Sequence, residues 1–351
     1  MHGHMVFTQS VLESKLLKER FCLLHVDISD HRGFDTLGRF DFLNIVLAAQ
    51  HLGRLARVLL FRRPRVVHVP LSQNRLGLGR DLVFVAIALL ARARVVAHVH
   101  GGGLGPFLAA APRWFSVPAR SLLGRCAALV VMTSSQGKGL AAQLPRGRMV
   151  ILAHGTAASQ IAPRVGGERG LSALYVSSNL QTSKGLWPML DAAVQTQREG
   201  ITAHWDIVGV WLGEKTRIEA QARVEGVDGI RFHGELAPEL LAKRYEDADV
   251  FVFPTGETEG FALVRIEAMA AGLPVLTTPA GGGAEIVRDG QDGFIVDYDD
   301  PQQIVSRLKQ LRDNPELLSR LSRSAQQRHR DSFSSAAFEQ GLAALYARVA
   351  A

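Results

Sequence analysis

The stretch from Val250 to Val287 constrains the fold more than any other part of the chain. It opens with a continuous apolar run, Val250–Phe253, which is typical of a parallel strand covered on both faces. A short helix pattern follows and ends at Gly272, and Pro274 prevents its continuation. A second strand and a Gly-rich turn then open another helix. This order predicts two places where backbone N–H groups meet the carboxyl end of a parallel strand, which is where α/β folds bind phosphates.

The same stretch contains two carboxylates, Glu259 and Glu267, eight residues apart. Gly260-Phe261 follows the first, and Ala-Met-Ala-Ala-Gly-Leu-Pro follows the second. The pattern resembles the E-x7-E signature of family 4 (group 1) glycosyltransferases, which are retaining enzymes of the GT-B fold. A lone Glu267 would be interpreted as a solvated helix carboxylate, but the surrounding residues favour a functional one.

The rest of the chain alternates strand and helix patterns, which predicts right-handed βαβ units and parallel sheets. The strands expected in the first half are Phe21–Ile28, Arg65–Pro70, Arg94–His100 and Ala127–Thr133. Those expected in the second half are Leu171–Val176, Ala203–Val208, Ile230–His233, Val250–Phe253, Pro274–Thr277 and Gly293–Val296. The helices expected are Val6–Arg20, Phe40–Phe61, Leu78–Ala91, Trp114–Arg125, Pro301–Arg330 and Ser335–Val349. We therefore expect an α/β protein with two doubly wound, Rossmann-like domains facing a cleft, the GT-B architecture.

An aperiodic Gly/Ala-rich segment, Ala153–Gly170, is the expected linker between the domains. Residues 1–160 then form an acceptor-side domain and residues 161–351 a domain that binds the nucleotide sugar, and the last helix can pack back on the first domain. The resemblance covers the second domain from Leu171 to about Arg330.

The first domain opens without a strand, because the chain runs from Gly3 straight into the helix pattern Val6–Arg20. In similar enzymes a hydrophobic strand precedes a Gly-containing loop that binds donor, and Gly3 resembles the glycine of that loop. The first strand of a doubly wound sheet is usually central, so its absence costs core. A start site chosen too far downstream is the favoured explanation, and a variant sheet is the alternative.

The charge is distributed unevenly along the 351 residues. Residues 1–170 carry 22 Lys and Arg against 8 Asp and Glu, whereas residues 171–351 carry 18 against 25. A basic half predicts an anionic partner. No recognition-helix, RNP or zinc-finger pattern supports nucleic acid, and an anionic phospholipid surface explains the asymmetry equally well.

The sequence favours a cytoplasmic protein. Its longest apolar run in the first half, Leu82–Ala91, is much shorter than the roughly 20 residues that span a bilayer. No signal peptide is recognised, and Cys22 and Cys126 are expected to be reduced core thiols. The segment Pro106–Arg125 combines aromatic and aliphatic residues with arginines, so it fits either peripheral attachment to the inner face of the cytoplasmic membrane or a core-facing helix with a solvated basic side.

Sugar transfer from a nucleotide sugar needs a group that stabilises the leaving diphosphate. Lys184, in Ser183-Lys184-Gly185 at the start of a helix, is the expected cation. Similar proteins carry a basic residue about five positions earlier, where this chain has Asn179. An amide can donate hydrogen bonds but brings no charge, so donor binding depends more strongly on Lys184 and on backbone amides.

The resemblance assigns further donor contacts in the second half. It places Glu267 at the ribose hydroxyls, and Glu259 at the 3- and 4-hydroxyls of the transferred sugar. Glu259 would act there with three backbone amides, those of Gly260, Phe261 and Ala262. The turn Arg231–Gly234 matches one whose backbone meets the nucleobase, and His233 within it is either a donor contact or a capping or core histidine.

In the first half, a strand ends in a glycine cluster, His98-Val-His100-Gly-Gly-Gly. The cluster indicates a tight turn, and the resemblance places His100 beside the sugar and the acceptor. His98 points to the same face and is interpreted as structural. The expected catalytic residues are thus Glu259, His100 and Lys184. The polar loop Asp30–Asp35 is a weaker candidate for acceptor contacts.

No metal or cofactor is expected. Asp247 and Asp249 mimic a metal-binding D-x-D pattern but precede a buried strand, so they are interpreted as solvated turn residues; Asp297–Asp300 is interpreted as a helix N-cap cluster. The prediction is a retaining glycosyltransferase that moves a sugar from a UDP- or GDP-sugar to a glycan or lipid-linked acceptor in cell-surface polysaccharide or glycolipid synthesis. The alternative is a catalytically weak GT-B protein that acts as a binding or scaffold component. An epimerase or phosphorylase of the same fold is less favoured.

Overall fold

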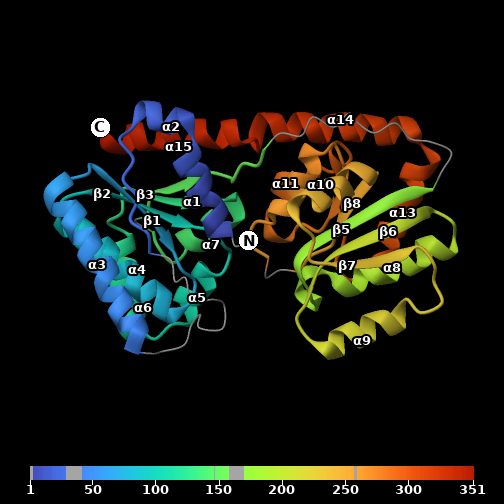
Figure 1. Cartoon of the computed structure of the whole chain (residues 1–351), viewed down its shortest axis with the longest axis horizontal. Coiled ribbons are helices and arrows are strands. Elements are labelled where there is room, and N and C mark those ends of the chain that lie inside the picture. Colours follow the sequence, from blue (N-terminus) through green and yellow to red (C-terminus); the bar gives the residue numbers. More distant parts are fainter. Residues whose placement is uncertain (1–2, 29–41, 146, 158–169, 257–258) are drawn as a thin grey trace. The chain divides into compact units, whose positions relative to one another are not determined.

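The computed structural model describes residues 3–28, 42–145, 147–157, 170–256 and 259–351. The chain divides into two compact units, shown with their elements in Figure 1. Unit 1 consists of Met1–Ala153 together with Phe338–Ala351, and unit 2 consists of His154–Ala337. The end of the chain is therefore part of the same unit as its beginning.

Unit 1 is built on a parallel sheet with the strand order β1-β2-β3-β4. The strands are β1 (Val66–Leu71), β2 (Arg94–Val99), β3 (Ala128–Val131) and β4 (Met149–Ile151). Successive residues of β2 point to opposite faces, so that Val95 and Ala97 belong to one hydrophobic core and Val96 to another. The sheet is thus covered on both faces, as parallel sheets usually are.

Helices supply the rest of both cores of unit 1. They are α1 (Gly3–Glu13), α2 (Lys15–Arg20), α3 (Phe42–Arg62), α4 (Arg75–Leu90), α5 (Leu104–Ala110), α6 (Arg113–Leu123), α7 (Ser134–Ala141) and α15 (Ser335–Ala350). The first core contains residues of α3 to α7, whereas α15 dominates the second together with Phe7 and Leu17. Figure 1 shows α1 and α2 beside α15, where the Ser14 hydroxyl donates to Glu339 Oε2 at 2.6 Å.

Unit 2 contains a six-stranded parallel sheet with the order β10-β9-β8-β5-β6-β7. The strands are β5 (Leu171–Leu180), β6 (Thr202–Trp211), β7 (Ile230–Gly234), β8 (Val250–Phe253), β9 (Val275–Thr277) and β10 (Gly293–Ile295). From β5 the order proceeds through β6 and β7 on one side and through β8 to β10 on the other. The direction of winding therefore switches between β5 and β8. In open α/β sheets, ligands bind outside the carboxyl ends of the strands at such a switch point.

The connections of unit 2 are mostly helical. They are the short 3-10 segments η2 (Thr182–Lys184) and η3 (Ala280–Gly282), and the helices α8 (Leu186–Arg198), α9 (Glu214–Arg223), α10 (Pro238–Asp247), α11 (Leu263–Ala270), α12 (Gly283–Ile286), α13 (Pro301–Asp313) and α14 (Pro315–Ser332). All four residues of β8 are buried, as the apolar run in the sequence predicts.

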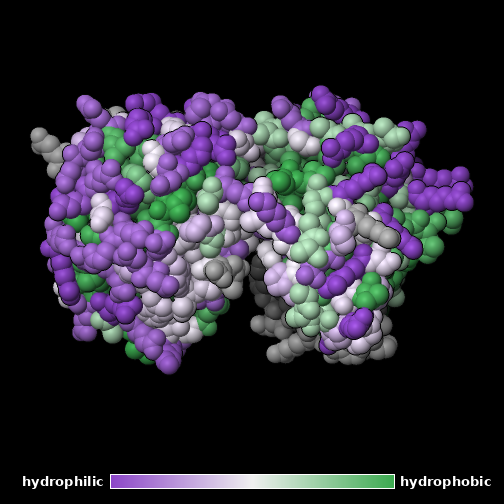
Figure 2. Space-filling view, turned by 180° about the vertical axis from the view of Figure 1, so that it is seen from behind, coloured by the Kyte–Doolittle hydropathy of each residue, from purple (hydrophilic) through white to green (hydrophobic). Residues whose placement is uncertain are grey.

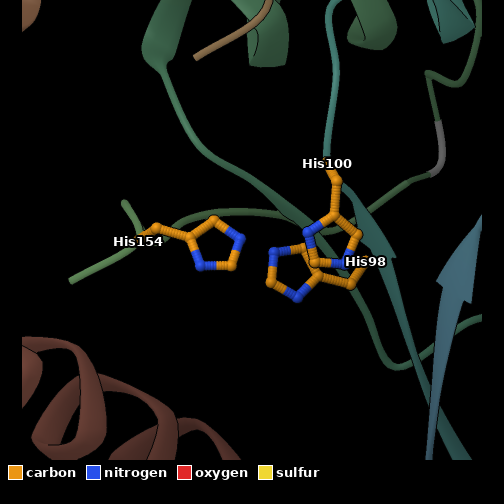
Figure 3. Close-up of side chains that lie close together, drawn as sticks. All are labelled: His98, His100 and His154. Carbon is orange, nitrogen blue, oxygen red and sulfur yellow. The ribbon is translucent and has the colours of Figure 1, made fainter. Parts of the chain in front are cut away.

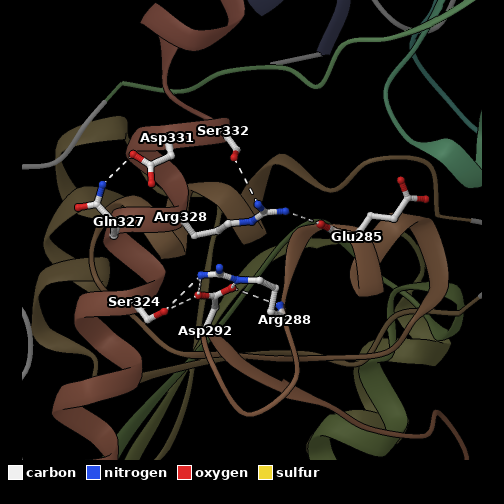
Figure 4. A network of polar contacts seen from close by, with 8 residues as sticks. All are labelled: Glu285, Arg288, Asp292, Ser324, Gln327, Arg328, Asp331 and Ser332. Carbon is white, nitrogen blue, oxygen red and sulfur yellow. Dashed lines mark hydrogen bonds and ion pairs between the residues drawn. The ribbon is translucent and has the colours of Figure 1, made fainter.

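A polar network joins the segment after the Gly-rich turn to α14 (Figure 4). The guanidinium of Arg288 donates to both carboxylate oxygens of the buried Asp292, at 2.7 and 2.6 Å. From α14, Ser324 donates to Asp292 at 2.7 Å, and Arg328 donates to the carbonyl of Glu285 at 3.0 Å. These contacts fix α12 and the turn before β10 against a long helix.

The six strands expected in the second half are confirmed, each within a few residues of its predicted bounds. The expected strand Phe21–Ile28 is wrong: no strand is present among residues 3–28. The apolar side chains Phe21 and Leu23 pack on the second core of unit 1, and Ile28 on the first, without pairing with a strand. Strand β4 is not among the expected strands; its residues are half-buried or exposed, unlike the mostly buried residues of the equally short β9 and β10.

Two expected helices are interrupted by capping residues. Val6–Arg20 breaks at Ser14, whose hydroxyl accepts a hydrogen bond from Leu17 N and so starts α2. Pro301–Arg330 breaks at Asn314, which caps α14 in the same way. Pro315 follows it and cannot continue a helix, because it has no N–H group.

No helix among the described residues is both long and apolar enough to cross a membrane. On the face shown in Figure 2, hydrophobic residues form separate patches between hydrophilic ones. Both cysteines are free, as expected, but only Cys126 is a core thiol. Cys22 is exposed, because it lies in the irregular segment after α2.

Candidate active site

The loop after β5 lies at the switch point of the unit 2 sheet. Lys184 ends η2, and Gly185 caps the start of α8 with a φ of 79°. A Cβ atom on Gly185 would lie 1.9 Å from the carbonyl oxygen of Pro254, just after β8. Only glycine fits both the backbone conformation and the space, so the turn holds Lys184 against the carboxyl end of β8.

The backbone around Lys184 is fixed by four hydrogen bonds from other elements. They run from the Tyr175 hydroxyl to the carbonyl of Lys184 (2.9 Å), from the Thr255 hydroxyl and the Gly256 amide to the carbonyl of Ser183 (both 3.0 Å), and from the Tyr298 hydroxyl to the carbonyl of Thr182 (2.8 Å). Burial raises the pKa of Tyr175 well above its usual range, which keeps its hydroxyl a donor. Movement of Lys184 is therefore confined to its side chain.

Lys184 forms an ion pair with Glu259, the first carboxylate of the E-x7-E pattern. Lys184 Nζ lies 2.5 Å from Glu259 Oε2, and the two side chains keep 23% and 10% of their exposure. The other oxygen of Glu259 accepts a hydrogen bond from the Gly260 amide at 3.1 Å. The structure thus brings together a cation suited to phosphate and a carboxylate suited to hydroxyl groups, at the edge where ligands bind.

The Gly-rich turn after β9 packs directly against Glu259. Gly281 and Gly282 have φ angles of 57° and 75°. A Cβ atom on Gly281 would lie 2.8 Å from both Cβ and Cγ of Glu259. The turn can adopt this path only because its residues are glycines, and it forms one wall beside the Glu259 side chain.

Arg265 is a site residue that the sequence analysis missed. It is fully buried on α11, and its guanidinium donates to the carbonyl oxygens of Gly281 and Ala280, both at 3.0 Å. The guanidinium also lies 5.4 Å from the ring centroid of Phe253 in β8. Burial lowers the pKa of Arg265 to about 10, while the charge of Glu259 acts in the opposite direction, so the side chain remains a cation at neutral pH. It fixes the turn that contacts Glu259.

Glu267 lies on the same helix as Arg265. The Tyr245 hydroxyl of α10 donates to Glu267 Oε2 at 3.1 Å. Burial raises the pKa of Glu267, and the hydrogen bond from Tyr245 offsets part of that shift. Gly260, Phe261 and Ala262 form the path from Glu259 to the start of α11, where Ala262 is the capping residue.

His233, at the end of β7, belongs to a charged cluster around Asp206 of β6. His233 Nε2 lies 2.6 Å from Asp206 Oδ1, and Arg244 of α10 and His204 contact the other oxygen at 3.3 and 3.6 Å. Burial alone would raise the pKa of Asp206, but hydrogen bonds from His204 and His233 and their charge hold it well below its usual range. The imidazole is thus anchored to the sheet, and Gly234 turns the chain with a φ of 67°.

Asn179 lies near the end of β5, next to the loop that carries Lys184. Its side-chain Oδ1 atom is buried and accepts no hydrogen bond from the described residues. A buried acceptor of this kind is costly unless another group satisfies it. A donor group of a ligand would do so.

In unit 1, His98 and His100 lie at the carboxyl end of β2 with stacked rings, 4.1 Å between centroids (Figure 3). His98 is fully buried, and its Nδ1 atom lies 3.2 Å from Nε2 of His68 on β1. Nδ1 of His68 lies 2.6 Å from the Tyr346 hydroxyl on α15. Phe7 packs its ring edge against both His98 and His100. His68 and Tyr346 were not predicted, since nothing in their sequence context marks them.

The glycine cluster after His100 packs against Gln73, which follows β1. The Gly103 amide donates to Gln73 Oε1 at 2.9 Å. A Cβ atom on Gly101 would lie 2.1 Å from Gln73 Nε2. The Gln73 side chain thus packs over the glycine cluster and connects two loops at the carboxyl edge of the unit 1 sheet.

The remaining candidates have structural contacts or lie outside the description. Gly3 is the first residue of α1, and the loop Asp30–Asp35 lies outside the described residues. Asp249 accepts a hydrogen bond from the Ser172 amide at 2.9 Å, and Asp247 ends α10. Asp300 caps α13, which confirms the predicted N-cap in that cluster.

Residues 168–328 match the protein family described as Glycosyl transferases group 1. Over 112 residues, the chain is 40% identical to the D-inositol 3-phosphate glycosyltransferase of Streptomyces avermitilis, a match that covers 32% of this chain and 24% of that protein. Over 177 residues, it is 29% identical to the putative colanic acid biosynthesis glycosyltransferase WcaL of Salmonella typhimurium, which covers 48% and 43%. The chain thus matches less than half the length of these relatives.

Among solved structures, the chain is similar to Anabaena HepE in complex with UDP. The TM-score is 0.69 at 18% sequence identity, and the match covers 88% of this chain and 90% of that one. At this identity the likeness shows the fold. It confirms the predicted α/β architecture of two parallel-sheet domains, the GT-B type.

Proposed function

Because residues 168–328 form a domain of the glycosyl transferases group 1 family, we propose that this protein transfers a sugar from a nucleotide-sugar donor to an acceptor, with retention of anomeric configuration. One observation carries the proposal. The Lys184–Glu259 pair lies at the switch point of the unit 2 sheet, where a phosphate-binding cation and a hydroxyl-binding carboxylate are needed together.

Lys184 stabilises the diphosphate that leaves with the nucleoside. Negative charge develops on the leaving group as the glycosidic bond breaks, so a cation held on a fixed backbone lowers the barrier. The chain itself supplies this charge, and the proposal assigns no step to a metal ion or cofactor. The donor is a UDP- or GDP-sugar.

Glu267 and Glu259 contact different parts of the donor. Glu267, next to the Tyr245 hydroxyl, accepts hydrogen bonds from the ribose hydroxyls. Glu259 leaves Lys184 and accepts from the 3- and 4-hydroxyls of the transferred sugar, with the amides of Gly260, Phe261 and Ala262 around it. His233 and Gly234 border the nucleobase, and Asn179 Oδ1 accepts from the donor.

Within unit 1, His100 is the residue that contacts the acceptor. Its ring is stacked on His98, which the hydrogen-bonded pair His68 and Tyr346 holds in place. Ring stacking leaves His100 one orientation at the end of β2. A positioned imidazole suits hydrogen bonding to a sugar or acceptor hydroxyl.

We further propose that the acceptor is a glycan or a lipid-linked glycan in cell-surface polysaccharide or glycolipid synthesis. The support is the name of the Salmonella relative, which places that protein in colanic acid biosynthesis. The basic first half of the chain is consistent with work at the anionic inner face of the cytoplasmic membrane.

The side chains of α5 and α6 limit how such attachment could work. Phe107, Phe115 and Leu122 pack against the first core of unit 1, and Leu123 is buried. Trp114 is 70% exposed and has the Arg75 guanidinium 5.3 Å from its ring centroid. The side chains available to contact a membrane are therefore Trp114, the nearby Val117 and the surrounding arginines. The helix does not present a complete amphipathic face.

A binding or scaffold protein is the second candidate, and Asn179 is the observation that favours it. A neutral amide near the diphosphate weakens the electrostatic attraction for the donor. Such a protein would bind nucleotide without turnover.

Thermal-shift screening with UDP, GDP and their sugars, together with a donor-hydrolysis assay, tests the proposal. A ligand at 100 times its Kd adds about 2.7 kcal/mol to stability, which gives a measurable rise in Tm. We expect one nucleoside diphosphate and its sugar to raise Tm, and slow hydrolysis of that donor. Lys184→Ala should reduce both effects, whereas Lys215→Ala, which removes an exposed lysine of the same unit, should leave them unchanged.

The outcomes separate the two candidates. Nucleotide binding without donor hydrolysis or transfer would favour the scaffold protein. No stabilisation by any nucleotide would overturn the assignment of the unit 2 site.

A further inference from the structure

A cavity of about 550 Å³ lies wholly within unit 1, at the amino ends of its strands. Three arginines line it: Arg94 begins β2, Arg148 directly precedes β4, and Arg348 lies in the last turn of α15 near the terminus marked C in Figure 1. The remaining lining residues are Ala127, Met149, Val150 and Val349. None of the lining residues is acidic.

In the described parts of the chain, no counter-ion lies beside the three guanidinium groups. Among the described residues, none of them forms a hydrogen bond or an ion pair, and all three side chains are exposed to solvent. Between Phe42 and Ala157 the chain contains 15 Lys and Arg residues and a single acidic residue, Asp81. Asp81 is fully buried. It forms an ion pair with Arg80 and accepts a hydrogen bond from the Ser72 amide. The cavity therefore carries a positive potential that the described residues around it do not neutralise.

We propose that this cavity binds the phosphate group of an organic phosphate. Arginine presents planar, paired N–H donors that match phosphate oxygens, and three arginines from three elements can surround one phosphate or diphosphate. Three like charges that line one cavity repel one another, and a bound anion would relieve that repulsion. The four apolar residues accommodate the uncharged part of the ligand.

The size of the cavity fits this class of ligand. Sites for small molecules are typically about 300–1,000 Å³ and combine an apolar lining with a few polar groups. The cavity falls within that range and has such a lining.

The cavity is separate from the candidate active site. Arg94 and His98 lie toward opposite ends of β2, and the glycine turn after His100 lies at the carboxyl edge of the sheet. Six residues separate Arg94 from His100, which at about 3.3 Å per residue is roughly 20 Å along the strand. A ligand in the cavity is thus neither the donor nor a group within hydrogen-bond reach of His100.

Pyrophosphate is the probe for the first arm of the test. It is titrated into a Lys184→Ala variant, which weakens the competing donor site of unit 2, and binding is followed by calorimetry. Methyl NMR of labelled methionine adds a local signal, because Met149 lines the cavity and Met149→Leu assigns its resonance. Arg94→Gln/Arg148→Gln/Arg348→Gln, made in the same Lys184→Ala background, removes the three charges. Arg54→Gln/Arg57→Gln/Arg62→Gln, also made in that background, removes three exposed charges from α3 and is the matched control.

We expect pyrophosphate to bind and to shift the Met149 signal. Each single arginine substitution should weaken the Kd about tenfold, the usual effect of losing one charge-assisted hydrogen bond. The triple cavity variant should lose binding and the NMR shift, whereas the α3 control keeps both. Circular dichroism melts of both triple variants check that the fold is unchanged.

The second arm uses vesicles of phosphatidylglycerol, since a lipid headgroup offers the same phosphate chemistry. Vesicle binding that the cavity variant loses and the α3 control keeps would assign the phosphate to a lipid, and pyrophosphate binding with the same pattern would assign it to a soluble ligand. If neither arm distinguishes the cavity variant from the α3 control, the cavity is not a phosphate site and the proposal fails.

Discussion

Lys184 and Glu259 are 75 positions apart in the chain, and their charged atoms lie 2.5 Å apart across the switch point between β5 and β8. When donor binds, Lys184 would exchange Glu259 for the diphosphate. Glu259 would exchange Lys184 for the sugar hydroxyls. Because the backbone of Ser183 and Lys184 is held by hydrogen bonds from Tyr175 and Thr255, Lys184 can make the exchange by moving its side chain.

Lys184→Ala should weaken UDP or GDP binding about tenfold to a hundredfold, the effect of losing one or two hydrogen bonds to a charged group. Binding of the nucleoside without phosphates should change little. Calorimetry with diphosphate and nucleoside measures both, with Lys215→Ala as the control. Equal affinity of the variant and the wild type for the diphosphate would contradict the role of Lys184.

Glu259→Gln should have opposite effects on binding and turnover. It removes the charge that competes for Lys184, so the Kd for the diphosphate without a sugar should fall about threefold to tenfold. The kcat for sugar transfer should fall at the same time, since contacts of Glu259 to the sugar strengthen as charge develops. Glu219→Gln, on the exposed face of α9, is the control. Weaker diphosphate binding would show that Glu259 does not compete for Lys184.

Glu267→Gln should raise the donor KM, yet stabilise the protein near neutral pH. The pKa of Glu267 is raised in the folded state, mainly by burial, so the folded protein retains a proton that the unfolded chain releases above about pH 4.3. The carboxyl group therefore lowers the free energy of unfolding as pH rises through and above that value. Urea unfolding should find the variant more stable than the wild type at pH 7 and equal to it below pH ~4. A stability difference that does not depend on pH would argue against this explanation.

Arg265→Lys should loosen the Gly-rich turn. Lysine cannot reach the carbonyls of Ala280 and Gly281 with two parallel donors, and an unsatisfied buried carbonyl costs about 1–3 kcal/mol. Urea unfolding should show a loss of stability of that size, and the KM for the donor should rise. Arg217→Lys, at an exposed position on α9, should change neither. A stable variant with an unchanged KM would mean that the turn is positioned by other contacts.

Membrane attachment predicts that the protein co-sediments with vesicles that contain anionic lipid and dissociates at high salt. Arg113→Gln/Trp114→Ser/Arg125→Gln should weaken it, since each basic residue near such a surface contributes about 1 kcal/mol. Arg120 is left intact, because it donates to the Leu108 carbonyl at 2.9 Å and to Gln143 at 2.6 Å. Arg198→Gln/Lys215→Gln in unit 2 is the control. Recovery of the wild type in the supernatant under all conditions would exclude attachment.

The fold of unit 2 could be predicted because its strands are largely buried, mostly apolar runs between turns. β8 has the predicted bounds, since four buried residues are followed directly by Pro254. In unit 1, Phe21–Ile28 has the composition of a strand, but a strand also needs a partner, and pairing is a property of the whole sheet. The three residues of β4 are recognisable only beside β3.

The candidate site shows the same limit. Lys184, Glu259 and Glu267 were found because each lies in a local motif. Arg265 was missed because its position on α11 gives no sign that a charged side chain is buried there. The Lys184–Glu259 pair joins two loops that are adjacent only in the folded sheet.

The composition of unit 1 from two distant segments has a consequence for its synthesis on the ribosome. The second core of this unit contains Phe338, Leu342 and Tyr346, which are translated after the whole of unit 2. At about 5–20 residues per second, the intervening residues take roughly 10–40 s to emerge. During that interval Val96 and Val130 lack the α15 side chains that cover them in the folded protein. The nascent chain thus completes unit 2 first, and chaperones have a defined surface to protect until the last helix arrives.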